Sequence, residues 1–329
     1  MDPVAFTRAL VDIDSTTGRE GEAARWVAAQ LRDLGYTVTE QPVSDNRFNV
    51  FARLPAPPRV VFSTHLDCVP PFFPSRQEDG LVFGRGSCDA KGILAAQVAA
   101  AQRLRAGGES RIGLLFVAGE ERGSDGARAA NEQAPPGVEF LINGEPTDNR
   151  LGAATRGVLR VRLHASGRAA HSSFPELGES AIDKLLDALM AIRRLALPED
   201  PLLGRTHYSI GLIEGGVAPN VISPRASAEL LFRTVGPGGD IRRLLGEVEP
   251  LVTVEEVLDM PAVRLHTVPG FETAVFPYTT DVPLLSRWGR PLLLGPGSIH
   301  VAHTDAEHLS VDELREAIDL YAALARTVN

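Results

Sequence analysis

Short apolar runs alternate with helical stretches over the first 152 residues, and this alternation leaves few folds open to the chain. The runs at 59–64, 111–118 and 138–142 are continuous, as in strands that are buried on both faces of a sheet. Segments with apolar residues at helical spacing lie before and between them, at 20–34, 92–104 and 124–132. We therefore predict an α/β domain with a largely parallel central sheet.

Beyond residue 156 the pattern changes to that of an α+β unit. The predicted order is strand-helix-strand-strand-helix-strand, at 158–165, 180–195, 206–213, 226–233, 238–248 and 251–258. This order is ferredoxin-like. The α/β pattern returns near residue 263, with a strand at 292–294 and a helix at 311–326. We predict an inserted domain at 157–262 within a first domain that comprises residues 1–156 and 263–329.

Composition and charge argue against several classes of partner. No apolar run in the 329 residues approaches the roughly 20 residues of a membrane-spanning helix, so we expect no membrane partner. The first residues lack the basic and apolar regions of a secretion signal, which favours a cytoplasmic protein. The formal net charge of −9 would repel phosphate backbones, so we expect no nucleic-acid partner.

Candidate metal ligands follow the predicted strands at their carboxyl ends. His65 and Asp67 follow the first buried run. Glu120 and Glu121 follow the second run, and Glu145 follows the third. In open α/β sheets the carboxyl ends of the strands border the ligand site, so we expect these side chains to lie close together.

Two further candidates lie outside the strands: Asp89 precedes a predicted helix, and His303 lies in a late loop. Carboxylates crowded at one sheet edge repel one another unless a cation neutralises them, so the pattern predicts a metal site. Two divalent cations and one hydroxide would balance the charges of Asp89, Glu121 and Glu145. Imidazole and carboxylate ligands suit zinc, with cobalt or manganese as alternatives.

Seven short motifs follow one another along the chain. They are His-Leu-Asp-Cys-Val-Pro-Pro (65–71), Gly-Arg-Gly-Ser-Cys-Asp-Ala-Lys-Gly (84–92), Gly-Glu-Glu-Arg-Gly (119–123), Gly-Glu-Pro-Thr (144–147), Gly-Arg-Ala-Ala-His-Ser-Ser (167–173), Gly-Gly-Val-Ala-Pro-Asn-Val-Ile (215–222) and Gly-Pro-Gly-Ser-Ile-His-Val-Ala-His (295–303). Together and in this order they resemble the motifs of the M20 metallopeptidases and deacylases, the group that includes acetylornithine deacetylase and glutamate carboxypeptidase. The resemblance implies a zinc-peptidase-like catalytic domain with an inserted lid and dimerisation domain.

The resemblance also implies how two zinc ions would be held. His65 and Glu145 would bind one ion. Glu121 and His303 would bind the other, and Asp89 would bridge the two. His300 is an alternative to His303, but the Ala-His-Thr-Asp-Ala-Glu sequence around His303 favours the latter.

Three catalytic roles follow from the same resemblance. Asp67 would accept the free ring N–H of His65 and fix its tautomer. Glu120 would be the general base that takes a proton from water and passes it to the leaving amine. His171 would reach from the lid into the active site of a second subunit and stabilise the oxyanion. We expect a homodimer paired through an edge strand of the lid, and the strand at 158–165 leads directly to His171.

Several candidates keep alternatives open. Asn220 and Arg233 match lid positions that meet a substrate carboxylate, but Arg233 is equally explained by a salt bridge within its strand. Cys68 and Cys88 flank the ligands and would be soft ligands, a redox pair or, as we favour, small residues packed under the site.

The leading prediction is a di-zinc amidohydrolase that removes an acyl group from an N-acyl amino acid, as acetylornithine deacetylase does. A dipeptidase or carboxypeptidase that uses the same centre is the alternative within enzymes. The third hypothesis is a non-catalytic binding protein on the same fold. The complete ligand set and the presence of Glu120 disfavour it.

Overall fold

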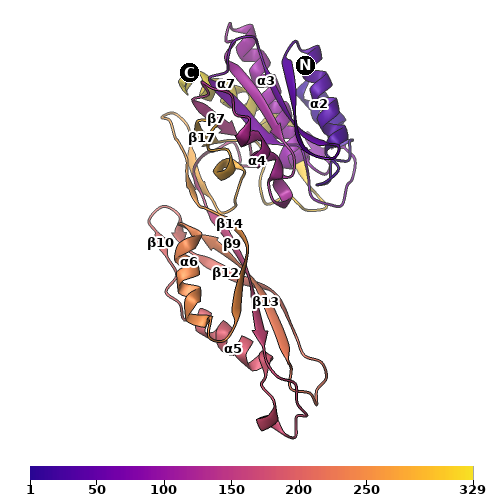
Figure 1. Cartoon of the computed structure of the whole chain (residues 1–329). Helices are drawn as coiled ribbons and strands as arrows, with labels where there is room; N and C mark the ends of the chain where they lie inside the picture. Colours follow the sequence, from indigo (N-terminus) through magenta and orange to yellow (C-terminus); the bar gives the residue numbers. More distant parts are fainter. Residues whose placement is uncertain (329) are drawn as a thin grey trace. The chain divides into compact units, whose positions relative to one another are not determined.

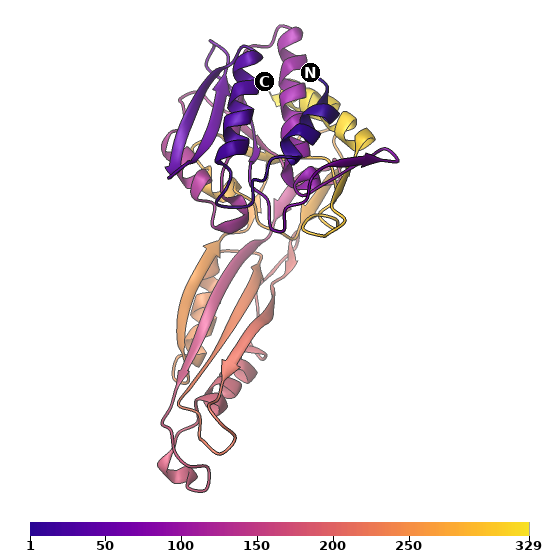
Figure 2. The ribbon, with the colours of Figure 1, turned by 90° about the vertical axis from the view of Figure 1, so that its right-hand side faces the viewer.

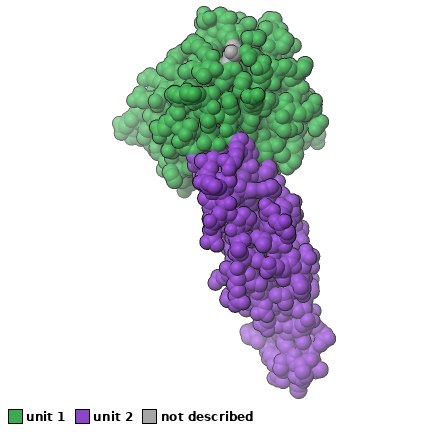
Figure 3. All heavy atoms as spheres, turned by 90° about the vertical axis from the view of Figure 1, so that its left-hand side faces the viewer, with its two compact units in different colours: residues 1–153, 265–274, 280–329 green, residues 154–264, 275–279 purple. Residues whose placement is uncertain are grey.

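The computed structural model describes residues 1–328, which form two compact units (Figure 3). Unit 1 comprises Met1–Ala153, Leu265–Ala274 and the residues from Thr280 onward. Unit 2 comprises Ala154–Arg264 and Val275–Thr279. The short return of the chain to unit 2 at 275–279 has no counterpart in the sequence-based prediction.

Unit 1 is built on a mixed sheet with the strand order β1-β2-β6-β3-β7-β17. The strands are β1 (Thr37–Ser44), β2 (Arg47–Arg53), β3 (Val60–His65), β6 (Ile112–Val117), β7 (Phe140–Asn143) and β17 (Arg290–Leu293). The last four run parallel, while β1 and β2 form an antiparallel hairpin on the edge of β6. Every residue of β3 and β6 is buried, which explains their continuous apolar sequences.

Helices and loops cover both faces of this sheet. The helices of unit 1 are α1 (Pro3–Val11), α2 (Gly21–Asp33), α3 (Gly92–Ala106), α4 (Asp125–Glu132) and α7 (Val311–Val328), most of them labelled in Figure 1. Successive strand residues point to opposite faces. Phe62 therefore packs into the core beneath α1, α2, α3 and α7, whereas its neighbour Val61 packs into a second core with α4 and Trp288.

Helix α3 is held close to the loop that precedes it. A Cβ atom at Gly92, the first residue of α3, would lie 2.4 Å from the Ser87 carbonyl oxygen. Only glycine fits this approach. The loop with Asp89 is therefore packed tightly against the start of α3.

Unit 2 has the predicted strand-helix-strand-strand-helix-strand order. Its elements are β9 (Gly157–Ser166), α5 (Ala181–Ile192), β12 (His207–Gly215), β13 (Arg225–Thr234), α6 (Gly238–Leu245) and β14 (Thr253–Met260). The four strands are antiparallel, and Figures 1 and 2 show them side by side in the order β12-β13-β9-β14. Strand β9 thus lies inside the sheet, so the edges that a second subunit could pair with are β12 and β14.

Short strands complete the fold. One three-stranded sheet has the order β18-β5-β4, another has the order β15-β8-β16, and β10 pairs with β11. Their bounds are β4 (Arg76–Glu78), β5 (Leu81–Phe83), β8 (Leu151–Thr155), β10 (Glu199–Asp200), β11 (Gly204–Arg205), β15 (Val263–Arg264), β16 (Thr273–Phe276) and β18 (His308–Ser310). Among the described residues, no helix combines the length and the apolar character needed to cross a membrane.

Candidate active site

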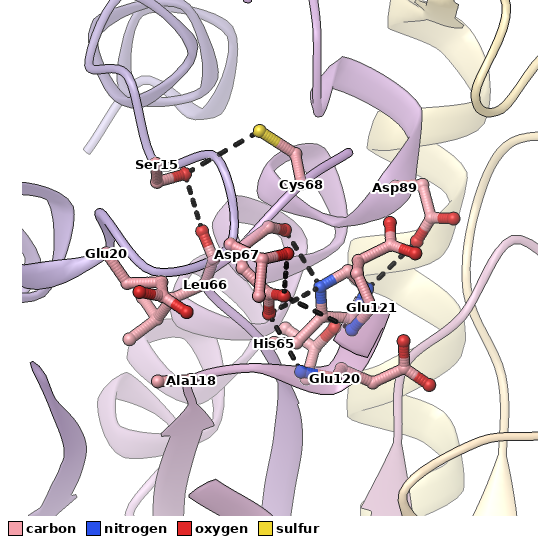
Figure 4. Close-up of polar contacts among 12 residues, drawn as sticks. Ser15, Glu20, His65, Leu66, Asp67, Cys68, Asp89, Ala118, Glu120 and Glu121 are labelled. Atoms are coloured by element: carbon pink, nitrogen blue, oxygen red, sulfur yellow. Dashed lines mark hydrogen bonds and ion pairs between the residues drawn. The ribbon is translucent and has the colours of Figure 1, made fainter. Parts of the chain in front are cut away.

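The end of strand β3 and two segments outside the strands bring a group of potential metal ligands together in unit 1. His65 is the last residue of β3, and Asp89 precedes α3. Glu121 lies in the helical turn η2 (Glu120–Arg122), which follows β6. One potential ligand atom of each of these three residues lies within 4.8 Å of the others. Figure 4 shows the three side chains meeting from separate segments of the chain.

Asp89 lies between two imidazoles. Its Oδ1 is 2.9 Å from Nε2 of His65, and its Oδ2 is 3.3 Å from Nε2 of His303. The same Nε2 of His303 lies 2.8 Å from Oε1 of Glu121. Each oxygen of Asp89 therefore faces a different histidine, as a bridging carboxylate requires.

The backbone at His303 is unusual. Its φ is 65°, in the left-handed region that few residues other than glycine adopt. Such strain persists where surrounding structure fixes it, and it is frequent at functional sites. His300, the alternative ligand, is exposed and has no contact with the other ligands among residues 1–328.

Glu145 lies on the His65 side of the group. Its Oε2 is 4.0 Å from Nε2 of His65, and its Oε1 is buried without a hydrogen-bond partner among the described residues. An unpartnered buried carboxylate oxygen is costly, and a cation would satisfy it. Two atoms that bind one tetrahedral zinc ion at about 2.0–2.1 Å lie roughly 3.3 Å apart, close to the spacings found between these side chains. The donor set therefore fits two divalent ions.

Contacts among the protein groups shift the pKa values of both imidazoles. Burial disfavours the charged form of His65, but contacts with Asp67 and Asp89 outweigh burial and hold its pKa well above the usual value. Hydrogen bonds to Asp89 and Glu121 raise the pKa of His303 to about 10. Burial would raise the pKa of Asp89, but the two histidines outweigh it and lower this pKa. Metal ions would displace the imidazole protons, so we expect binding to release protons.

Asp67 holds the turn that carries the two adjacent glutamates. The N–H groups of Glu120 and Glu121 donate to Oδ1 and Oδ2 of Asp67, at 3.0 and 3.1 Å (Figure 4). The hydroxyl of Thr17 also donates to Oδ2, at 2.8 Å. Nδ1 of His65 lies 2.9 Å from the carbonyl oxygen of Asp67 and 3.6 Å from Oδ1. The nearest acceptor for Nδ1 of His65 is therefore the backbone of Asp67, and the predicted carboxylate partner lies farther away, at ion-pair distance.

Glu120 carries a carboxylate without a hydrogen bond or ion pair among residues 1–328, whereas Glu121 is held by His303. Burial, together with the negative charges of Glu145 and Asp281, raises the pKa of Glu120 well above the usual value. A free carboxyl group with a raised pKa suits a general base near neutral pH.

The two cysteines are buried free thiols. Sγ of Cys68 lies 3.8 Å from Oγ of Ser15, and Sγ of Cys88 donates to the carbonyl oxygen of Ser298 at 3.5 Å. Burial raises the pKa of both thiols. Within the described residues, neither thiol joins the group of clustered ligand atoms. These contacts support the packing role rather than ligation.

Two buried carboxyl groups near this site were not among the predicted residues. Both oxygens of Asp281 are buried without a hydrogen bond among the described residues, and its charge acts on Glu120. Glu307 is fully buried and accepts an N–H from Asp89. Nothing in the sequence indicated Asp281. For Glu307, the only indication was its short spacing from His303.

The three predicted lid residues belong to unit 2, where they fall into two groups. His171 forms an isolated bridge with Val221, and the N–H of Ser172 donates to the carbonyl oxygen of Asn220. His171 and Asn220 are therefore neighbours, at the end of the sheet where Ser166 finishes β9.

Arg233 lies towards the other end of the same sheet. The opposite end of β13, Arg225, pairs with Ser166, while Arg233 pairs with Val158. Eight residues of strand separate Arg233 from Arg225, a span of roughly 26 Å. Asn220 and Arg233 of one chain are therefore too far apart to hold the same carboxylate together, and the role of each towards a substrate stays a prediction.

The guanidinium of Arg233 is half-buried and forms no ion pair with any other residue between 1 and 328. Burial alone lowers its pKa. The alternative of a salt bridge within the strand therefore finds no support. A partly desolvated arginine without a carboxylate is suited to binding an anionic ligand.

Clustered imidazoles and carboxylates at the end of a parallel sheet, with a free carboxylate beside them, define a metal-dependent hydrolase. The model of the peptidase family M20/M25/M40 matches residues 61–327, and the chain belongs to this family.

Known proteins agree with this assignment. A probable carboxypeptidase of Aspergillus clavatus is 39% identical over 375 aligned positions, which cover 98% of this chain and 83% of the relative. The aminopeptidase PepT of Bacillus cereus has the same fold, with a TM-score of 0.81 at 20% identity over 98% of this chain and 96% of that one. A dinuclear metal-binding M20 peptidase of Bacillus subtilis has a TM-score of 0.74 at 16% identity, over 99% and 97% of the two chains.

Proposed function

We propose that this M20 hydrolase is a di-metal carboxypeptidase that removes the C-terminal residue from short peptides. The observation that carries the proposal is the half-buried guanidinium of Arg233, which forms no ion pair among residues 1–328 and suits a free α-carboxylate. The relative from Aspergillus clavatus, named a probable carboxypeptidase, supports the same substrate class. An N-acetyl amino acid also has a free carboxylate, but none of the named relatives favours the deacetylase predicted from the sequence.

The side chains of unit 1 divide the chemistry between them. His65 and Glu145 would hold one ion, Glu121 and His303 the other, and Asp89 would bridge the two. Two divalent ions supply a Lewis acid for the scissile carbonyl and lower the pKa of a water molecule.

Glu120 moves the proton in the proposed reaction. Its carboxylate accepts a proton from the attacking water and donates it to the nitrogen of the departing amino acid. Asp67 keeps the backbone of Glu120 and Glu121 in place, so that one side chain is left to the proton while the other binds metal.

The separation of the lid residues supports a homodimer. His171 and Arg233 lie towards opposite ends of one sheet, so both can meet one small substrate only if they come from different subunits. Strand β12 is a free edge of that sheet within the described residues, and its Leu212 and Ile213 are well exposed. An exposed apolar edge strand is suited to pairing with a second copy.

A substrate panel tests the proposal. Purified protein loaded with zinc or cobalt is given dipeptides, tripeptides, their C-terminal amides and N-acetyl amino acids, and the released amino acid is identified. We expect release of the C-terminal residue from peptides with a free carboxylate, and loss of activity after chelation. Release of only the N-terminal residue, with equal rates on acids and amides, would contradict the carboxypeptidase. A clear preference for N-acetyl amino acids would restore the deacetylase.

A further inference from the structure

A buried carboxylate holds the main chain of the loop that carries Asp89. Glu307 is fully buried and lies four residues beyond His303. Its Oε1 accepts hydrogen bonds from the N–H groups of Gly86, Cys88 and Asp89, at 3.0, 3.2 and 3.1 Å. Backbone N–H groups that converge in this way form an anion-binding nest, which is filled by a side chain of the same protein.

The second oxygen of Glu307 connects the nest to another loop. Nη1 of Arg85 donates to Oε2 at 2.6 Å, and both side chains are buried. Nε of Arg85 donates to the carbonyl oxygen of Pro71 at 3.2 Å, and the guanidinium lies over the ring of Phe73. Glu307 thereby links the segments that contain Asp89 and His303 to the loop that follows His65.

The loop is shaped for this contact. Gly86 has a φ of 87°, a conformation that side-chain-bearing residues rarely adopt. A Cβ atom at Gly86 would also lie 3.0 Å from the side chain of Lys91. The glycine thus permits the turn that directs three N–H groups towards Glu307.

We propose that Glu307 is a positioning residue for the metal centre. It fixes the backbone of Asp89, and with it the short side chain whose two oxygens face His65 and His303. This inference rests on the proposed function, because it requires Asp89 to be a metal ligand. Glu307 touches no ion or substrate itself and acts only through Asp89.

Metal binding, rather than turnover, tests this role. Cobalt is titrated into chelator-treated wild type and Glu307→Gln, and the visible absorption and the dissociation constant are measured in competition with a chelator. Glu307→Asp, which keeps the charge but shortens the side chain, is measured in the same way. The thermal unfolding of each protein without added cobalt reports its stability.

Glu20→Gln is the matched control. Glu20 is as fully buried as Glu307 and is also paired with an arginine, Arg47, at 2.8 Å. Within residues 1–328 it forms no contact with a candidate ligand. Its loss removes a buried ion pair without removing the nest.

We expect Glu307→Gln and Glu307→Asp to weaken cobalt binding by roughly 10-fold to 100-fold and to alter the cobalt spectrum, as loss of a residue that orients a ligand does. Glu20→Gln is expected to change the dissociation constant by less than about 3-fold, even where it lowers the unfolding temperature equally. If Glu307→Gln does not fold, Glu307→Asp decides the question.

Wild-type affinity and spectrum in both Glu307 variants would overturn the proposal. Equal weakening in Glu20→Gln would also overturn it, because the effect would then be general loosening. A wild-type protein that binds no cobalt would refute the metal centre and this role together. Failure of the carboxypeptidase alone appears only in the substrate panel and leaves the ratio of the metal dissociation constants unchanged.

Discussion

Glu120 and Glu121 are neighbours in the chain but differ in their surroundings. Glu121 contacts His303, whereas the carboxylate of Glu120 has no partner among the described residues. Adjacent residues diverge in a turn, so the backbone contacts from Asp67 can orient both at once. The division between metal binding and proton transfer therefore follows from local geometry.

Glu120→Gln tests this division. The amide keeps the size of the side chain but cannot accept a proton, so turnover is expected to fall at least about 100-fold. Metal content, measured by elemental analysis, is expected to stay at the wild-type value. Loss of metal with retained turnover would instead exchange the roles of Glu120 and Glu121.

The carboxyl group of Asp281 makes the stability of the metal-free protein depend on pH. Burial raises the pKa of its carboxyl group to about 7, from 3.8. Between these values the folded state binds more protons than the unfolded state, so this group makes folding less favourable as the pH rises towards 7.

Asp281→Asn removes the ionisable group. After chelation, we expect the variant to have a higher free energy of unfolding than wild type. This gain should be larger at pH 8 than at pH 5, by on the order of 2 kcal/mol. Urea unfolding at the two pH values measures this difference. The exposed Asp33→Asn is the control, and an equal pH response in both variants would rule out the assignment.

At the scale of elements, strand β13 contains Arg233 and lies between β12 and β9 in the sheet of unit 2. Arg233→Met keeps an unbranched side chain of about the length of the arginine stem but removes the charged guanidinium group. We expect kcat/KM for a free peptide acid to fall roughly 30-fold or more, while that for the peptide amide stays near wild type. Arg160→Met, which removes an arginine paired with Glu229 in the same sheet, is the control. A similar loss on acid and amide would show that Arg233 has only a structural role.

The sequence predicted elements well where burial enforces a pattern. Strands β3 and β6 are fully buried and were visible as apolar runs, and β9 and β13 alternate as half-buried strands do. Strand β1 was missed because it is mostly exposed and carries little apolar signal. Strand β2 was missed although its centre is buried, because the apolar run there is short and interrupted by Asn49.

Contacts between segments far apart in the chain could not be predicted from the sequence. Glu307 meets Gly86, Cys88 and Asp89, which lie more than 200 positions earlier in the chain. Strand order had the same limit: the alternation of β9 showed that it is half-buried but not that it lies between two other strands. The separation of Asn220 and Arg233 along one sheet was likewise not visible in the sequence, and their role towards a substrate carboxylate stays a prediction.

For the whole molecule, we propose that a complete active site needs two chains, because His171 and Arg233 lie towards opposite ends of one sheet. His171→Ala and Glu120→Gln are each expected to be nearly inactive. Mixed equally and allowed to exchange, about half of the dimers would be mixed, and one site of each mixed dimer would contain both intact residues. We therefore expect roughly a quarter of wild-type activity to return.

Each variant exchanged with itself is the control and should recover nothing. If native mass spectrometry shows mixed dimers but activity stays absent, His171 does not act on the second subunit. A protein that remains monomeric at assay concentration, yet is fully active, would contradict the dimer itself.

The interruption of unit 1 by unit 2 sets an order of events during synthesis on the ribosome. Four of the candidate ligands emerge by Glu145, but His303 follows only after the whole of Ala154–Arg264 has been made. At about 5–20 residues per second, this interval lasts on the order of 10–30 s. The continuous segment Ala154–Arg264 can fold during this interval. The four candidate ligands up to Glu145 remain without His303 until it is synthesised. Premature capture of metal ions by the nascent chain is therefore a risk that this topology creates.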